Sequence, residues 1–255
     1  MERKRLGVIG GLGPLATAYF FELVIQMTDA ETDQEHVEMI IYSRPSIPDR
    51  TSYITGASRE NPLPAMAETG RWLVDQGAEI IAIPCITAHY FHKELAEVIS
   101  VPVIHIVRET AEHLSVHGIK KAGIMATDGT IYSGLFQKEL RERGIEGVLP
   151  DEKNQKYVMD LIYQDVKAGR PIEIEKFNEA ARYLKACGAE VIILGCTELS
   201  LIKRNYAIGA GYLDAMEILA RKAVLLCGAD LKGEYQCLIT GQQEGQNGRR
   251  GENVS

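Results

Sequence analysis

The sequence predicts an α/β fold made of two similar lobes, each with a parallel sheet wrapped by helices. Short apolar segments typical of buried strands alternate with longer segments that have helical periodicity. One nine-residue segment recurs 111 residues further along the chain. With 255 residues, 45% of them hydrophobic, the chain is long enough to bury two substantial cores.

The alternation can be followed in order along the chain. We expect strands at residues 6–9, 37–42, 79–83, 103–107, 122–126 and 191–194. Helical spacing marks residues 15–27 and 62–76. Pro45 and Pro48 mark residues 43–50 as a loop, because proline cannot donate a hydrogen bond within a sheet.

An internal repeat relates the two predicted lobes. Residues 77–85 (GAEIIAIPC) align without gaps on residues 188–196 (GAEVIILGC), and each copy predicts a turn, a buried strand and a cysteine beyond it. A weaker similarity relates residues 7–13 to residues 123–129 at an offset of 116. Two related halves are the simplest explanation.

The repeat places Cys85 and Cys196 at equivalent positions. Ligands of open parallel sheets bind outside the carboxyl ends of the strands, where both cysteines are expected. If the lobes are related by pseudo-twofold symmetry, the two sulfurs approach one cleft from opposite sides, so we expect the active site between the lobes.

We expect residues 1–100 with 208–230 to form the first lobe and residues 101–207 the second. Residues 231–255 are rich in Gly, Gln, Asn and Glu, so we expect a flexible tail there.

Composition excludes several classes of protein. A net charge of −7 argues against nucleic-acid binding, which requires a basic face. No apolar run approaches the roughly 20 residues of a membrane helix, and the N-terminus does not resemble a signal peptide. We therefore expect a cytoplasmic protein without membrane contact, whose five cysteines are reduced.

Two opposed thiols suggest a specific chemistry. A thiolate on one side of a carbon can remove a proton while a thiol on the other side delivers one, which inverts a stereocentre. A single cysteine more often packs as a small hydrophobic residue, and this interpretation suits Cys187, Cys227 and Cys237. The paired placement of Cys85 and Cys196 favours catalysis.

Five segments together carry a resemblance to a known family. They are residues 7–17 (GVIGGLGPLAT), 47–51 (IPDRT), 84–89 (PCITAH), 126–130 (ATDGT) and 195–199 (GCTEL). In this order they resemble the aspartate/glutamate racemase superfamily, in its aspartate racemase branch, from about residue 5 to residue 226. The resemblance implies amino-acid racemisation without pyridoxal phosphate, another cofactor or a metal, with Cys85 and Cys196 as base and acid. It also suggests a homodimer.

The resemblance assigns further residues to the substrate. Arg50 matches the arginine that grips the side-chain acid, a task suited to a guanidinium, and Lys167 resembles a second cationic contact. The other expected substrate contacts are Gly11, Leu12, Arg44, Ile86, Thr87, Thr130 and Thr197. The alternatives are a loop salt bridge between Arg50 and Asp49, and a solvated helix end at Lys167.

Three positions depart from the family pattern and leave the substrate open. Ile86 and Arg44 each stand where the family usually has Asn, and Leu12 stands where Met is common. Both cysteines are retained, so the type of reaction is better supported than the identity of the amino acid.

Four other functions were weighed. Gly11, Gly13 and Ala16 fit a loose dinucleotide fingerprint, but the acid expected after the second strand is missing. Cys85, His89 and His92 share a helix face but lack a fourth metal ligand, and we expect His89 to form a hydrogen bond and His92 to be exposed. A dicarboxylate-binding protein, or a superfamily decarboxylase or isomerase with one cysteine, also remains possible; two cysteines favour the racemase.

Overall fold

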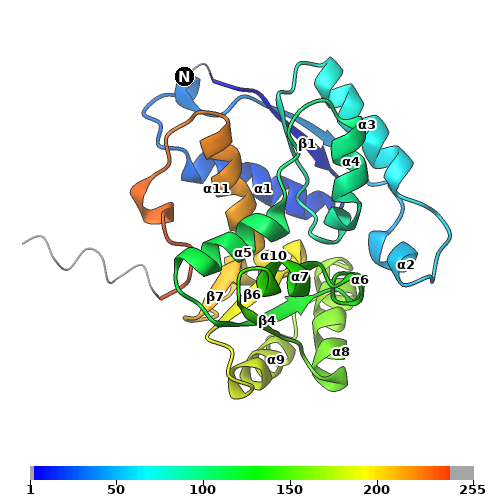
Figure 1. Ribbon diagram of the computed structural model, residues 1–255, viewed down its shortest axis with the longest axis vertical. Coiled ribbons are helices and arrows are strands. Elements are labelled where there is room, and N and C mark those ends of the chain that lie inside the picture. Colours follow the sequence, from blue (N-terminus) through cyan, green and yellow to red (C-terminus); the bar gives the residue numbers. More distant parts are fainter. Residues whose placement is uncertain (1–2, 242–255) are drawn as a thin grey trace, which may run out of the picture.

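Two parallel sheets, one in each lobe, organise the computed structural model, which describes residues 3–241 (Figure 1). The first sheet has the order β2-β1-β3, with β1 (Leu6–Gly10), β2 (Met39–Ser43) and β3 (Ile80–Ala82). The second has the order β5-β4-β6-β7, with β4 (Lys121–Ala126), β5 (Glu146–Val148), β6 (Val191–Gly195) and β7 (Tyr212–Asp214). The predicted α/β class is confirmed.

The two sheets repeat one arrangement. In each, the first strand of the lobe is flanked by the second strand on one side and the third on the other. The repeated segments contribute β3 and β6, which pair in parallel with β1 and β4 respectively. Chain direction around the sheet changes at β1 and at β4, and ligands of such sheets bind at this point.

Helices connect the strands and cover both faces of the sheets. They are α1 (Pro14–Met27), α2 (Arg50–Ile54), α3 (Leu63–Asp75), α4 (His92–Val98), α5 (Ile106–Val116), α6 (Asp128–Ser133), α7 (Leu135–Arg141), α8 (Glu152–Asp160), α9 (Ile174–Ala186), α10 (Thr197–Asn205) and α11 (Ala215–Leu226). A π-helical segment, Leu161–Val166, continues α8, and short 3₁₀ turns cover Asp33–Glu35, Thr87–Phe91 and Gly233–Tyr235.

Strand β1 shows why two helical layers form. All five of its residues are buried. Because successive side chains point to opposite faces, Leu6 and Val8 join the core under α1 and α11. Ile9 points the other way, into the core under α3. Such a strand is stable only with helices on both sides.

One hydrophobic core extends across both lobes. It contains Val8 from β1, Ile124 from β4 and buried residues of α5 and α11, among them Leu114 and Leu219. Helices α5 and α11 pack against each other beside this core (Figure 1). The lobes are therefore joined by continuous packing, which fixes the carboxyl ends of their strands relative to one another.

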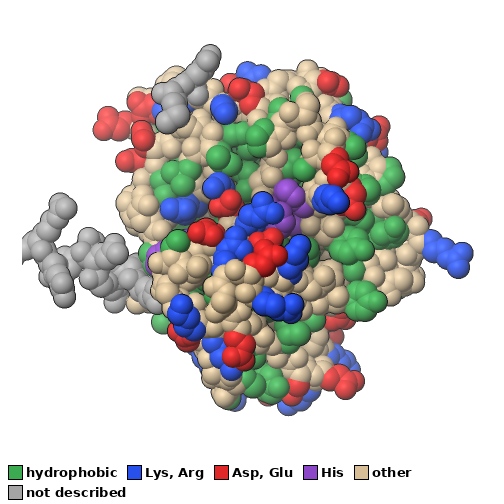
Figure 2. All heavy atoms as spheres, viewed as in Figure 1, with side chains coloured by type: hydrophobic (Ala, Val, Ile, Leu, Met, Phe, Trp, Pro, Cys, Tyr) green, Lys and Arg blue, Asp and Glu red, His purple; other side chains and the backbone are tan. Residues whose placement is uncertain are grey.

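Charged side chains of both signs intermingle over α5 and α7 (Figure 2). Arg143 forms ion pairs with Glu139 at 2.8 Å and with Glu112 at 3.0 Å, and Arg108 lies 3.8 Å from Glu139. This network joins the two helices on that face.

Three expectations from the sequence differ from the structure. Residues 103–107 do not form a strand: Val103 alone bridges Ile81, and α5 begins at Ile106. Strand β7 pairs with β6, so it belongs to the second sheet although we assigned residues 208–230 to the first lobe. Among the described residues, no helix is long and apolar enough to cross a membrane.

The expected flexible tail is wrong for residues 231–241. Leu238 and Ile239 are each 1% exposed, and Thr240 exchanges backbone hydrogen bonds of 2.9 Å with Gly211 and Tyr212. Two apolar residues within a polar segment were enough to anchor it. Residues 242–255, the remainder of the predicted tail, lie outside the described residues.

Candidate active site

Cys85 and Cys196 line the same pocket. Cys85 follows β3, and Cys196 follows β6 as the N-cap residue of α10. They are 7% and 6% exposed. The residues around them are Leu12, Asp49, Arg50, Thr51, Ile86, Thr87, Thr127, Tyr163, Lys167, Thr197 and Glu198. The free space of about 10 Å³ is roughly enough for one water.

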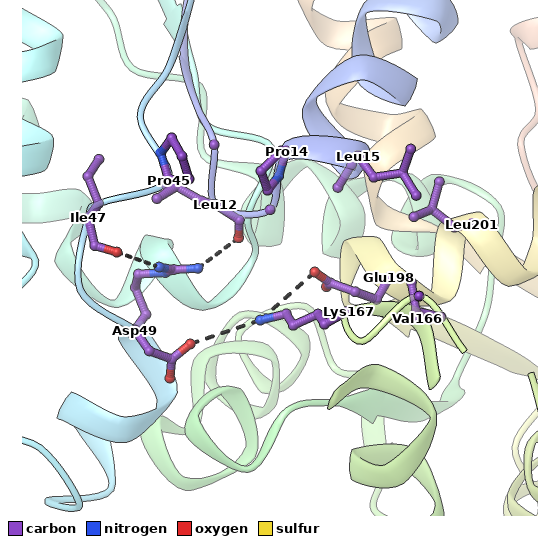
Figure 3. A pocket seen from close by; sticks show the side chains of 15 residues that line it. Leu12, Pro14, Leu15, Pro45, Ile47, Asp49, Val166, Lys167, Glu198 and Leu201 are labelled. Atoms are coloured by element: carbon purple, nitrogen blue, oxygen red, sulfur yellow. Dashed lines mark hydrogen bonds and ion pairs between the residues drawn. The ribbon is translucent and has the colours of Figure 1, made fainter. Parts of the chain in front are cut away.

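A larger cleft of about 580 Å³ adjoins this pocket (Figure 3). The two share Leu12, Asp49, Arg50, Lys167 and Glu198. The other lining residues are mainly apolar and come from both lobes: Gly11, Gly13, Pro14, Leu15, Ala16, Pro45, Ile47, Val166, Gly169 and Leu201. The cleft therefore gives access to the buried thiols along an apolar wall.

The Arg50 guanidinium is fixed by backbone carbonyls. It donates to Leu12 O at 2.7 Å, Pro48 O at 3.0 Å and Ile47 O at 3.4 Å, and it is 6% exposed (Figure 3). Its Nε atom is buried without a hydrogen-bond partner. Burial acts to lower the pKa of Arg50, but the charges of Cys85 and Asp49 outweigh it and raise that pKa. Arg50 thus places positive charge beside the Cys85 sulfur.

The Asp49 carboxylate serves two other partners, so the alternative of a simple loop salt bridge to Arg50 does not describe it. Asp49 Oδ1 accepts the Ser52 N–H at 2.8 Å and caps α2. Asp49 Oδ2 lies 3.3 Å from the hydroxyl of Tyr163, which donates to it. Burial raises the pKa of Tyr163 to about 12 and keeps it a donor at neutral pH.

The Cys196 thiol faces a carboxylate instead of a guanidinium. Its Sγ donates to Glu198 Oε2 at 2.9 Å, and Thr197 Oγ1 donates to the same oxygen at 3.3 Å. Burial and the negative charge of Glu198 raise the pKa of Cys196 well above its ordinary value, against the opposing charge of Lys167. Cys196 therefore holds its proton at neutral pH.

Lys167 connects the two lobes across the pocket. Its Nζ lies 3.9 Å from Asp49 Oδ2, 3.9 Å from Glu198 Oε1 and 4.3 Å from the centre of the Tyr163 ring (Figure 3). Burial acts to lower the pKa of Lys167, but Glu198 and Tyr163 raise it, so the ammonium stays charged. The π-helical segment before it, a feature common at functional sites, carries Tyr163. The alternative of a solvated helix end does not hold.

Three threonine hydroxyls join the lobes behind Cys85. The Oγ1 atoms of Thr87, Thr127 and Thr130 lie 2.9 to 3.1 Å apart in all three pairs. Thr130 is fully buried, so it supports Thr87 and Thr127, which line the pocket. A Cβ on Gly129 would lie 2.9 Å from Thr51 Cα, which explains why this contact requires glycine.

The loop after β1 presents a carbonyl to Arg50. The N–H of Gly11 donates to Thr17 Oγ1 at 2.9 Å. Gly11 has φ +86°, and a Cβ there would lie 2.6 Å from Arg44 C, so packing requires this glycine. The loop resembles a dinucleotide fingerprint for these structural reasons.

Arg44 is not brought to the pocket. Its guanidinium lies on α3, where it donates to Glu68 Oε2 at 2.8 Å and to Thr69 Oγ1 at 3.3 Å. Ile86, by contrast, lines the pocket and is 2% exposed.

His89 forms the hydrogen bonds expected of it. Its Nδ1 lies 3.0 Å from Cys85 O and its Nε2 lies 3.1 Å from Ile104 O, so it holds the cysteine loop. Burial, with His105 and His92, lowers the pKa of His89 to about 3. His92, expected on the surface, is half-buried with Nε2 2.9 Å from Val103 O. Neither histidine is directed at a shared metal position.

Sequence reasoning missed Glu198, Tyr163 and Asp49 as functional residues. Glu198 could have been found, because it stands two residues after Cys196 at the start of a predicted helix. Tyr163 gave no signal, since only the π-helical turn brings it beside Lys167.

Comparison with known proteins defines the class. The chain has the fold of a two-lobed racemase: the aspartate racemase of Picrophilus torridus superposes with a TM-score of 0.80 at 32% identity, covering 92% of this chain and 99% of that one. An aspartate racemase homologue from Pyrococcus horikoshii OT3 gives 0.70 at 26% identity, covering 88% and 99%.

The family follows from sequence. A family model described as Asp/Glu/Hydantoin racemase matches residues 9–223, and the chain belongs to this family. The broad specificity amino-acid racemase RacX of Bacillus subtilis is 28% identical over 225 residues, which cover 86% of this chain and 96% of the relative. Membership supports an amino-acid racemase.

Proposed function

We propose that the protein racemises amino acids without a cofactor, using Cys85 and Cys196 as opposed base and acid. One observation carries the proposal: two thiols line one small pocket in opposite electrostatic surroundings. Arg50 lies beside Cys85, whereas Glu198 accepts the proton of Cys196 at 2.9 Å. Groups of the same type whose environments favour different protonation states are typical of acid–base pairs.

The proton transfers balance in both directions. The Cys85 thiolate removes the α-hydrogen from one face of the substrate, and the Cys196 thiol delivers a proton to the other face. Turnover leaves Cys85 as the thiol and Cys196 as the thiolate, which is the starting state for the opposite enantiomer. Exchange with solvent restores the first state, in which Arg50 favours the Cys85 anion.

Two cations are available for the carboxylates of the substrate. Arg50 is prepositioned by three carbonyls, and Lys167 forms only long contacts of 3.9 Å with its acidic neighbours. A substrate carboxylate can therefore replace those contacts at Lys167 at little cost. An amino acid exceeds the space of about 10 Å³ beside the thiols, so binding has to widen the pocket toward the adjoining cleft.

The substrate is proposed to be aspartate, glutamate or a related amino acid. A printed name of one relative specifies aspartate, and another specifies broad specificity. Ile86 and Leu12, each 2% exposed, give the pocket apolar contacts where the family usually has Asn and Met. These contacts favour a range of side chains over strict selection of one acid. A cytoplasmic homodimer remains a prediction.

Incubation of single enantiomers in heavy water, without cofactor, tests the proposal. We expect loss of the α-hydrogen signal and growth of the opposite enantiomer for at least one of aspartate, glutamate and their sulfonate analogues. Cys85→Ser and Cys196→Ser should each abolish racemisation, whereas Cys187→Ser should not. Full activity in both active-site variants would show that the assigned roles are wrong. Binding without exchange would instead indicate a dicarboxylate-binding protein, and loss of carbon dioxide a decarboxylase.

A further inference from the structure

A second group of ligand-type side chains lies outside the active-site cleft. His113 and His117 stand four residues apart on α5, and Cys237 follows the 3₁₀ turn Gly233–Tyr235. One potential ligand atom from each residue lies within 4.8 Å of the other two. None of the three lines the pockets that hold the catalytic cysteines.

The His117 ring is oriented as a metal ligand would be. Its Nδ1 lies 2.7 Å from the carbonyl oxygen of His113 and must donate to it, because a carbonyl only accepts. In the neutral ring the lone pair is then on Nε2. Metal-binding histidines usually donate their other ring N–H to a carbonyl or carboxylate in this way. The two rings lie 4.2 Å apart between centroids.

The His113 ring directs a lone pair at the segment that carries Cys237. Its Nε2 accepts the N–H of Leu238 at 3.3 Å, so this nitrogen carries no proton. The bond is long for an N–H···N contact, and a metal ion would compete with it for the same lone pair. His113 is 5% exposed, whereas His117 and Cys237 are partly exposed, which leaves access from solvent.

We propose that His113, His117 and Cys237 bind one zinc ion, with water as the fourth ligand. Two imidazoles and one thiolate are a typical zinc ligand set, and the ion needs four ligands in a tetrahedron. Binding releases the Cys237 proton to solvent. The thiolate is essential because Arg221 places positive charge near His113, which opposes a dication.

The site would attach the C-terminal segment to α5. Residues 238–240 lie along β7, through the Leu213–Ile239 bridge and the hydrogen bond from Thr240 N to Tyr212 O. A zinc ion would add a link between this segment and the helix that packs against α11. Its role would be structural, independent of the proposed racemisation.

The test uses the Cys85→Ser/Cys196→Ser protein, because the active-site thiols could also bind a soft metal. Zinc chloride titrated calorimetrically should bind with a stoichiometry of one. Cobalt(II) should give the near-ultraviolet sulfur-to-metal band of a thiolate complex. Cys237→Ser should remove that band, and Cys237→Ser or His117→Gln should weaken zinc binding by roughly a hundredfold or more. Cys187→Ser, at a half-buried cysteine after α9, should change neither.

A second measurement separates binding from misfolding. Zinc should raise the melting temperature of the parent protein but not that of the His117→Gln variant, whose circular dichroism should match the parent. The proposal fails if zinc binds the His117→Gln and Cys237→Ser variants as tightly as the parent, or if no stoichiometric binding is found. Neither result would affect the racemase proposal, which rests on other residues.

Discussion

The thiol of Cys196 donates a hydrogen bond to the carboxylate of Glu198 across 2.9 Å in a buried site. Deprotonating this cysteine would place two negative charges in contact, so the carboxylate keeps the thiol neutral. Cys85, its counterpart in the repeat, has the Arg50 guanidinium beside it instead. The duplicated cysteines therefore differ in their charged neighbours, and this difference gives the first prediction.

Glu198→Gln should lower the pKa of Cys196, because the amide removes the negative charge that opposes the thiolate. In a Cys85→Ser background, the pH at which Cys196 reacts with iodoacetamide should fall by about one unit or more. Glu175→Gln, at an exposed residue of α9, should leave that midpoint unchanged. An unchanged midpoint in Glu198→Gln would mean that burial alone sets the pKa of Cys196.

Arg50→Lys should greatly reduce racemisation. A single ammonium cannot reproduce the guanidinium contacts with three carbonyls, and at least one buried acceptor would be left unpaired. We expect a loss of kcat/KM of at least about 100-fold, equivalent to roughly 2.7 kcal/mol. Arg44→Lys is the matched control: its guanidinium lies on α3, and an exposed ion pair is worth about 0–1 kcal/mol. Equal losses in both variants would contradict the assignment.

Gly11→Ala should destabilise the protein more than Gly56→Ala. Both glycines have positive φ, +86° and +79°, so alanine is strained by about 1–2 kcal/mol at either position. A Cβ at Gly56 meets open space, whereas one at Gly11 would lie 2.7 Å from Pro45 N. Urea unfolding should show an additional cost of roughly 1–3 kcal/mol at Gly11. Similar costs at both sites would mean that the loop yields without strain.

Stability should fall as the pH is lowered below about 6.5, the ordinary pKa of histidine. Burial, with neighbouring histidines, lowers the pKa of His89 to about 3 and that of His105 to about 4. Between these values and 6.5 the unfolded chain binds protons that the folded protein does not. Each group then contributes at most about 1.4 kcal/mol per pH unit to the slope. The contribution is complete above pH 6.5 and is lost toward the folded-state pKa.

His89→Gln isolates one of these contributions. The difference in unfolding free energy between the variant and the parent should shrink as the pH falls from 6.5 to 4, because glutamine does not titrate. Guanidinium unfolding at several pH values measures it. A difference that does not change with pH would show that His89 does not contribute to the acid sensitivity.

The repeat made the position of the cysteines predictable, because each follows a strand that a parallel sheet ends at one edge. Residues 103–107 show the limit of such patterns: an apolar run is compatible with a strand, yet only Val103 pairs, and the chain turns into α5 at Ile106. Leu238 and Ile239 show the converse, since a polar segment with two apolar residues can still pack.

The sequence by itself determined the α/β class, the duplicated halves and the two cysteines, because these follow from local periodicity and repetition. Only the tertiary structure decided what surrounds each thiol. Glu198 and Arg50 acquire their influence from distance and burial, and Lys167 meets Asp49 across the lobes after the π-helical turn. Arg44 adjoins the same loop but turns to Glu68. Charges interact through space, so their partners depend on packing between segments that are far apart in the chain.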